Sequence, residues 1–133
     1  RYLSLVYGSR AMTRARLDTG RRGEEIAAAW LAERGYHILE LNYRCPLGEM
    51  DIVARQGDVL VFVEVRTRRT DRFGRPLESV GSTKQRKLSQ IALYYLQRSN
   101  LEGVDARFDV VGIRLSREGS HIELVQDAFD MMT

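Results

Sequence analysis

The sequence predicts an α/β fold in which a central mixed β-sheet is flanked by helices. Two segments carry apolar residues at helical spacing, one early in the chain and one in its second half. Shorter segments rich in β-branched and apolar residues lie between and after them, bounded by glycine, proline and polar turn residues. The resulting order, α-β-β-β-α-β-β, favours a mixed sheet with a helix on each face.

The two helices are predicted from their apolar stripes and their end signals. The first covers residues 23–34 and ends before Gly35. The second begins at Ser82, because Gln85 stands three residues later and completes a capping box. Its buried face is expected to consist of Leu88, Ile91, Ala92, Tyr95 and Leu96.

The strands are predicted over residues 36–44, 49–55, 58–67, 107–115 and 121–125. The second and third form a β-hairpin around Gly57, which supplies the positive φ of a tight turn. The apolar run in the third strand indicates burial on both faces of the sheet. Residues 68–81 are polar and are expected to form a loop.

Length and composition favour a single globular domain. The chain has 133 residues, of which 44% are hydrophobic and 29% charged, as in ordinary soluble proteins. No apolar run approaches the ~18 residues of a membrane span, and no signal-peptide pattern is present. A single cysteine, Cys45, excludes an internal disulfide. We therefore expect a cytoplasmic protein without membrane contact.

Positive charge is concentrated at the start of the chain. Residues 1–22 hold six arginines and one aspartate, a net charge of +5, whereas the whole chain carries +3. We expect residues 1–19 to form a flexible basic segment and residues 20–133 to form the folded domain. A basic arm of this kind either binds phosphates or is a solvated terminus.

Acidic residues on the two strands of the hairpin form the pattern that points to chemistry. If Gln56 and Gly57 form the loop, Glu49 lies opposite Glu64. A four-residue loop instead places Asp51 directly opposite Glu64. Both arrangements put these carboxylates on one face, within the ~5–8 Å reach of cross-strand side chains.

Carboxylates crowded beside an apolar strand require a compensating positive charge, because repulsion and burial both oppose their ionisation. A divalent cation or the nearby Arg66 meets this requirement. Mg²⁺ usually takes one or two carboxylates, water and phosphate oxygens, a donor set that describes a phosphodiesterase site. Glu24 either joins this site from the first helix or only complements that helix's dipole.

Several ordered motifs resemble those of the YraN-like family of bacterial proteins. They are Gly20-Arg21-Arg22-Gly23-Glu24, Gly48-Glu49-Met50-Asp51, Val61-Phe62-Val63-Glu64-Val65-Arg66 and Arg107-Phe108-Asp109-Val110-Val111. The resemblance extends over roughly residues 20–130. That family is similar to the archaeal Holliday junction resolvases and to the restriction-endonuclease-like, or PD-(D/E)XK, superfamily. The resemblance therefore implies a restriction-endonuclease-like fold and a nuclease activity.

The same resemblance implies roles for four residues. Asp51 and Glu64 match the superfamily's metal-binding acids, and Glu24 matches the first-helix glutamate of the resolvase branch. The expected cofactor is Mg²⁺ or Mn²⁺. Arg66 occupies the position of the superfamily's lysine. Because arginine stays charged, Arg66 can stabilise a transition state but cannot act as the general base.

Five basic residues are candidates for contact with nucleic acid, DNA being the favoured partner. Arg68, Arg69 and Arg72 belong to a stretch, residues 66–75, with a net charge of +4, and Lys84 and Lys87 open the second helix. These side chains either follow a phosphate backbone or are ordinary solvated residues.

Glu49, Gln85 and Asp109 are candidates for supporting the site. Asp109 alternates with apolar residues in a strand that we expect to be buried. A structural hydrogen bond explains this position as well as a catalytic role does.

Three functions are compatible with these features. The first is a metal-dependent endonuclease acting on DNA, including branched or processed DNA. The second is a catalytically weak or inactive nucleic-acid-binding module, which Arg66 favours. The third is a purely structural role, in which Arg66 and neighbouring arginines neutralise the acids. A homodimer is expected only by analogy with the dimeric resolvases.

Overall fold

The computed structural model describes residues 12–69 and 79–132, with side chains from residue 20 onward. Its elements are α1 (Met12–Glu33), β1 (His37–Cys45), β2 (Gly48–Gln56), β3 (Val59–Arg69), α2 (Ser82–Arg98), β4 (Ala106–Ser116) and β5 (Gly119–Val125). This is the predicted α-β-β-β-α-β-β order, so the expected fold class is confirmed.

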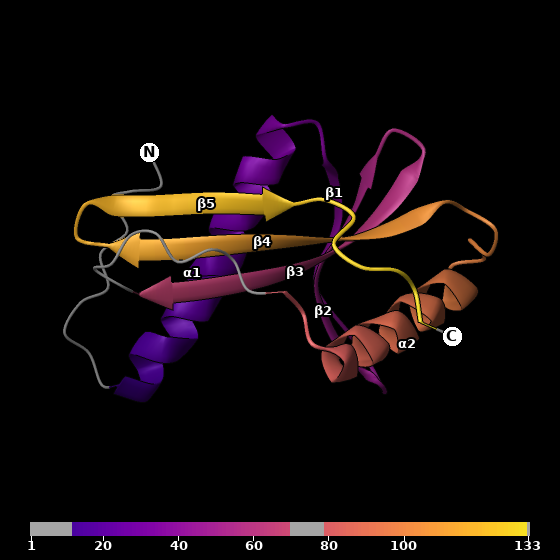
Figure 1. The fold of residues 1–133 in the computed structure, drawn as a ribbon, viewed down its shortest axis with the longest axis horizontal. Coiled ribbons are helices and arrows are strands. Elements are labelled where there is room, and N and C mark those ends of the chain that lie inside the picture. Colours follow the sequence, from indigo (N-terminus) through magenta and orange to yellow (C-terminus); the bar gives the residue numbers. More distant parts are fainter. Residues whose placement is uncertain (1–11, 70–78, 133) are drawn as a thin grey trace.

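The five strands form one mixed sheet in the order β1-β2-β3-β4-β5 (Figure 1). β3 and β4 pair in parallel, and every other neighbouring pair is antiparallel. A parallel pair requires a crossover connection, and α2 lies in the segment that joins β3 to β4.

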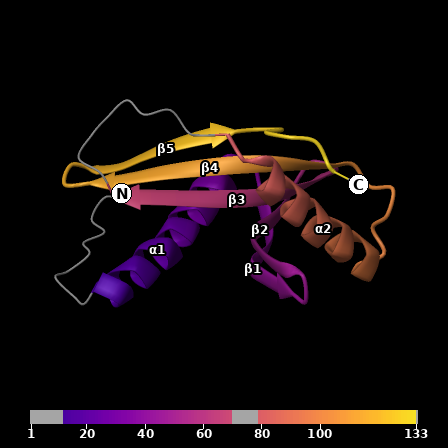
Figure 2. The ribbon, with the colours of Figure 1, turned by 60° about the horizontal axis from the view of Figure 1, so that its bottom comes forward.

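The two helices cover opposite faces of the sheet (Figures 1 and 2). Leu60 and Phe62 of β3 pack in the core on the α2 side, whereas Val61 and Val63 pack on the α1 side. These four side chains are at most 3% exposed. The prediction that this strand is buried on both faces is therefore confirmed.

The start of α1 and the capping of α2 differ from the sequence prediction, whereas α2 begins at Ser82 as predicted. α1 begins at Met12 rather than at residue 23, so residues 12–19 are helical. These residues include Met, Ala, Arg and Leu, which favour helix without forming a sustained apolar stripe. The predicted capping box is wrong, because Gly81 is the N-cap of α2 and makes no side-chain cap. The Gln85 side chain instead donates to the Val80 carbonyl at 2.7 Å.

The hairpin register settles which carboxylates face each other. Gln56 pairs with Val59, so Gly57 and Asp58 form the turn and the predicted Gln56-Gly57 loop is wrong. Gly57 has a φ of +59°, as the turn requires. The pairs continue to Ile52 opposite Val63, and the next position along this register places Asp51 opposite Glu64. The alternative register considered from the sequence is the correct one.

Strand β3 is longer than predicted and continues to Arg69, because it pairs with β4 as far as Leu115. Arg68 and Arg69 therefore lie on a strand rather than in a loop. Arg72 lies outside the described residues. Within the described ranges, neither helix is long and apolar enough to span a membrane.

Candidate active site

Asp51 lies where strands β2 and β3 separate. The β2–β3 ladder is regular up to Ile52 opposite Val63. Beyond it, the backbone amide of Val65 donates to Oδ2 of Asp51 at 2.7 Å. The Asp51 carboxylate thus accepts the amide hydrogen bond that a backbone carbonyl would accept in a continuous β-ladder. This hydrogen bond fixes the orientation of the Asp51 side chain between the two strands.

Three acids from three elements interact at this point: Glu24 of α1, Asp51 of β2 and Glu64 of β3. We call them the carboxylate cluster. Burial, the charge of Asp51 and a hydrogen bond with Asp51 together raise the pKa of Glu24 to about 7. Burial also raises the pKa of Asp51, although the Val65 amide opposes it. The cluster therefore retains protons more readily than isolated acids do.

The close packing of α1 on β3 brings Glu24 to the cluster. Gly23 is buried, and a Cβ at this position would lie 1.8 Å from Oγ1 of Thr67 and 2.9 Å from its Cβ. A larger residue would push the helix away from the strand. The hydrogen at Gly23 therefore sets the helix–strand distance that Glu24 needs to reach Asp51.

Two cations partly balance Glu64. Nζ of Lys84, in the first turn of α2, lies 3.6 Å from Oε2 of Glu64. The Glu64 side chain is 13% exposed and that of Lys84 is 51% exposed. Burial and the charge of Asp51 raise the pKa of Glu64, while Lys84 and Arg66 lower it. Lys84 was predicted as a nucleic-acid contact, and its position beside the acids was not predicted.

The donor atoms of the cluster fit a hard divalent cation, although they do not form a complete cage. Among the described residues, no group of three His, Cys, Asp or Glu side chains is arranged to hold a metal ion directly. Two carboxylates with water and phosphate oxygens are nevertheless the usual ligand set of Mg²⁺. Asp51 and Glu64 can supply two such oxygens, and Glu24 can contribute through water.

The three supporting candidates lie in different surroundings. Glu49 pairs with Arg44 at 3.6 Å, both side chains being more than half exposed, and its charge also raises the pKa of Glu24. Gln85 is engaged with the backbone before α2, which favours a structural role. Lys87, one of the candidate nucleic-acid contacts, is exposed and lies beside Gly48 at the start of β2.

Asp109 belongs to a separate buried network. It is fully buried and accepts hydrogen bonds from the Tyr36 hydroxyl at 2.7 Å, Nε of Arg107 at 2.9 Å and the Asp127 amide at 3.0 Å. These bonds join the segment before β1, strand β4 and the segment after β5. They favour the structural alternative for Asp109 over a catalytic one.

The fold and the site define an α/β protein with an acidic cluster at the point where strands β2 and β3 separate. The chain belongs to the uncharacterised protein family UPF0102, which matches residues 23–113. The prediction of a YraN-like family is confirmed at this level.

Relatives in that family cover most of this chain. A UPF0102 protein of Syntrophus aciditrophicus is 55% identical over 86% of this chain and 91% of its own length. Another, from Moorella thermoacetica, is 51% identical over 89% of this chain and its full length. Among solved structures, SfsA of Pyrococcus furiosus in complex with Ca²⁺ is 15% identical, with a TM-score of 0.37. The likeness covers 85% of this chain and 62% of SfsA, and it is too weak to support conclusions.

Proposed function

We propose that this protein is a Mg²⁺- or Mn²⁺-dependent nuclease that hydrolyses phosphodiester bonds of DNA on a restriction-endonuclease-like fold. The observation that carries the proposal is the carboxylate cluster of partly buried acids from α1, β2 and β3, in which burial raises the pKa of all three acids and the charge of Asp51 further raises those of Glu24 and Glu64. Such a cluster gains stability from a cation and is poorly explained by folding alone. The motif resemblance supports the same activity.

In this proposal Asp51 and Glu64 are the direct metal ligands. Both are largely desolvated, and the Val65 amide holds Asp51 in one orientation. Glu24 holds a water beside them and accepts or releases a proton close to neutral pH. The bound metal supplies Lewis-acid activation of the phosphate and of water.

Lys84 and Arg66 supply the positive charge that a phosphoryl transition state requires. Lys84 lies at the edge of the carboxylate cluster with half of its side chain exposed. Its ammonium group can therefore contact a phosphate oxygen while it remains close to Glu64. Arg66 is half-buried on β3, and its fixed charge suits electrostatic stabilisation rather than proton transfer.

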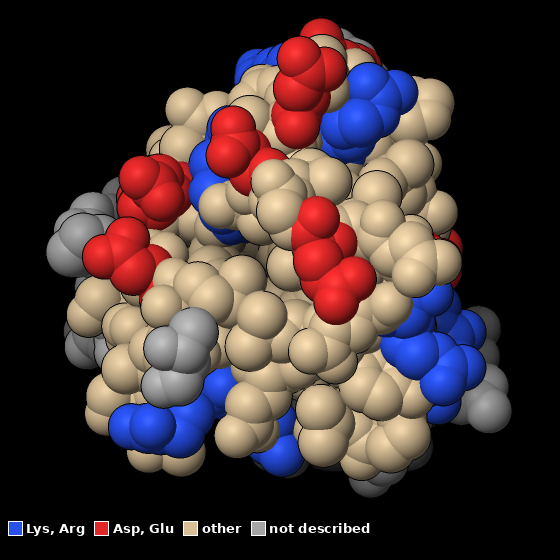
Figure 3. All heavy atoms as spheres, turned by 90° about the vertical axis from the view of Figure 1, so that its right-hand side faces the viewer, with Lys and Arg blue, Asp and Glu red and all other residues tan. Residues whose placement is uncertain are grey.

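DNA contact is proposed along the end of β3 and the start of α2. Arg68 and Arg69 are exposed at the end of the strand that carries Glu64, and Lys87 is exposed one turn after Lys84. On another face, which contains the right-hand side of Figure 1, acidic and basic side chains are interspersed, and the basic ones form no continuous track (Figure 3). A duplex backbone is therefore better placed at the cluster than on that face.

The test is cleavage of plasmid and four-way-junction DNA by the purified full chain with Mn²⁺ or Mg²⁺. Asp51→Ala and Glu64→Ala are expected to lower the cleavage rate at least a hundredfold. Glu24→Gln is expected to have a smaller effect. Asp58→Asn, in the hairpin turn, and Glu25→Gln, which points to solvent beside Arg22, are matched controls that should retain full activity.

The outcomes separate the candidate functions. Cleavage that survives both alanine substitutions reflects a contaminating nuclease and rejects the proposal. Salt-sensitive DNA binding without cleavage at any metal concentration supports the second candidate, an inactive binding module. The arginine at position 66 is the specific feature that favours this second candidate, and Arg66→Lys should then create or restore activity.

A further inference from the structure

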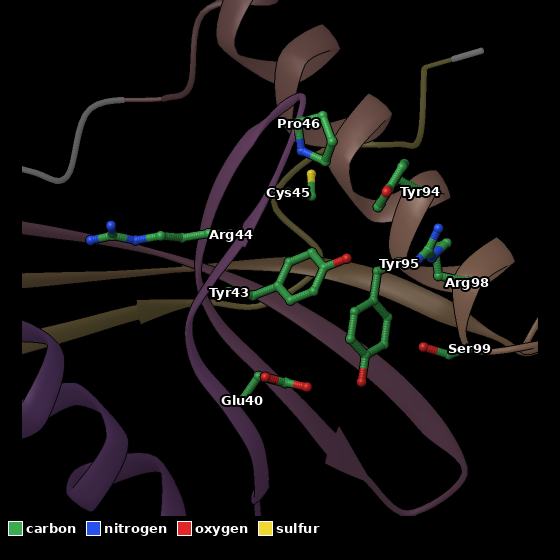
Figure 4. A pocket seen from close by; sticks show the side chains of 9 residues that line it. All are labelled: Glu40, Tyr43, Arg44, Cys45, Pro46, Tyr94, Tyr95, Arg98 and Ser99. Atoms are coloured by element: carbon green, nitrogen blue, oxygen red, sulfur yellow. The ribbon is translucent and has the colours of Figure 1, made fainter.

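A hollow of about 330 Å³ lies between strand β1 and the C-terminal half of α2 (Figure 4). Its size is at the lower end of the range for small-ligand sites. Three tyrosines, Tyr43, Tyr94 and Tyr95, contribute to its lining, together with Glu40 and Arg98. None of these residues belongs to the carboxylate cluster, so the hollow is a separate feature of the surface.

Two of the three tyrosine rings of the hollow pack against other aromatic rings. Tyr43 and Tyr95 meet edge to face with centroids 5.0 Å apart, and Tyr95 meets Phe62 in the same way at 5.8 Å. Tyr95 is 8% exposed and forms part of the core, whereas Tyr43 and Tyr94 are half-buried. Rigid aromatic surface that remains partly open is suited to stacking on a planar ligand.

Charged groups occur at the same place. The guanidinium of Arg98 lies over the Tyr94 ring at 5.6 Å from its centroid, and its side chain is exposed. Glu40 is exposed on β1, and its charge acts on both Tyr43 and Tyr95. In Figure 4 the Arg44 side chain points away from the rings, so Arg98 is the cation that a ligand would meet.

The hollow adjoins the strand that carries Asp51. Tyr43 pairs with Met50, the residue before Asp51, and Cys45 pairs with Gly48. The β1–β2 hairpin thus contributes to both places, to the hollow through Tyr43 and Cys45 and to the cluster through Asp51.

We propose that this hollow receives one unpaired nucleotide of a DNA strand bound at the carboxylate cluster. The base stacks on Tyr43 and Tyr94, and Arg98 binds its phosphate. Glu40 accepts a hydrogen bond from the exocyclic amino group of a cytosine or adenine. The inference rests on the proposed action on DNA, and it assigns that action to DNA that is not fully paired.

The single cysteine of the chain provides a direct test, because Cys45 lines the hollow and is partly accessible. The full chain is treated with a small thiol reagent in the presence of EDTA, so that cleavage plays no part. A duplex with one unpaired cytosine should slow modification of Cys45 several-fold, whereas a fully paired duplex of equal length should not. Equal rates with both duplexes would overturn the proposal.

A binding measurement with variants provides the second test. The fluorescence of 2-aminopurine at the unpaired position should be quenched on binding, and Tyr94→Ala or Arg98→Ala should weaken affinity about tenfold. Tyr94→Phe keeps the ring and should bind as the wild type does. Arg34→Ala is the matched control, because Arg34 stands over Trp30 on α1 in the same manner, at 3.7 Å.

The outcomes remain separate from those of the cleavage assay. Quenching and Cys45 protection in a protein that cuts no DNA would support the hollow while rejecting the nuclease proposal. Cleavage of paired and unpaired substrates at equal rates, with no quenching, would reject the hollow while leaving the nuclease proposal intact.

Discussion

Asp109 and the carboxylate cluster are two acidic sites that the fold accommodates in opposite ways. Asp109 is fully buried, yet it accepts hydrogen bonds from the Tyr36 hydroxyl, the Arg107 guanidinium and the Asp127 amide. In the carboxylate cluster, acids face one another, and burial raises the pKa of all three. Asp109 is fully paired within the protein, whereas Lys84 and Arg66 compensate the negative charge of the cluster only in part.

The difference shows how burial alone fails to identify a functional acid. The Asp109 network also includes Gln126, whose amide donates to the Tyr36 hydroxyl at 2.9 Å. The network connects the segment that follows β5 to β4 and to the residue that precedes β1. Each of its polar groups strengthens the native fold. The carboxylate cluster instead weakens the metal-free fold, and such a cost is typical of residues retained for function.

The first prediction applies the same substitution to both groups and has the largest expected effect. Asp109→Asn should lower the free energy of unfolding by about 3 kcal/mol, because it leaves the Arg107 guanidinium without its counter-charge. Asp51→Asn should leave the stability unchanged or raise it by up to about 1 kcal/mol, because it removes repulsion with Glu24 and Glu64. Urea unfolding of both variants without divalent cations measures the difference. Equal losses in the two variants would contradict the comparison.

The second prediction concerns the contact that delivers Glu24 to the cluster. Gly23→Ala should cost about 1–3 kcal/mol and displace α1, because the new methyl group meets Thr67 at 1.8 Å. Gly20→Ala is the control within the same helix, where a Cβ meets nothing within 4 Å. That change should stabilise the protein by about 0.5–1 kcal/mol through helix propensity. Thermal unfolding checks both signs, and stabilisation by Gly23→Ala would show that α1 packs differently.

The sequence predicted those features of the fold and site that follow from local periodicity. The alternation of side chains along a strand places Asp51 and Glu64 on one face for any even hairpin loop. The element order and the double burial of residues 60–63 follow in the same way. The predicted start of the first helix at residue 23 and the predicted capping box at Ser82 were wrong, because no apolar stripe marks residues 12–19 and no side chain caps α2 at Gly81.

Features that depend on packing between distant elements were not predictable. The approach of Gly23 to Thr67 requires the position of α1 on the sheet, and the sequence shows only a glycine in a helix. The contact between Lys84 and Glu64 joins α2 to β3, two elements that residues 70–81 separate in the sequence. One signal was available, since Lys84, Arg86 and Lys87 oppose the helix dipole at the start of α2 and so suggest an acidic neighbour.

The third prediction uses Lys84 to separate metal binding from catalysis. Lys84→Ala should change stability by less than about 1 kcal/mol, because the pair is half-exposed on the lysine side. It should tighten Mg²⁺ binding by about fivefold, because it removes a positive charge close to Glu64, and it should lower DNA cleavage about tenfold. Lys87→Ala, one turn further along α2, should leave Mg²⁺ affinity unchanged. Titration calorimetry measures the affinity, and weaker Mg²⁺ binding by Lys84→Ala would argue against a metal at this site.

The fourth prediction concerns pH and has the smallest expected effect. The pKa of Glu24 rises from 4.5 to about 7 on folding, so the folded protein binds a proton more tightly than the unfolded chain. Its contribution to stability is therefore present below pH 4.5 and is lost as the pH rises through 7. Asp51 and Glu64 shift in the same direction. Glu24→Gln should flatten this decline in urea unfolding measured from pH 5 to 8.

The matched control is Glu25→Gln, because Glu25 is exposed beside Arg22 on the same helix and should leave the pH profile unchanged. If a divalent cation replaces the retained protons, Mg²⁺ should stabilise the wild type more at pH 8 than at pH 5.5. Asp109, already paired inside the protein, should contribute nothing to this Mg²⁺ effect. An equal gain at both pH values would place the cation elsewhere and remove the main distinction between Asp109 and the carboxylate cluster.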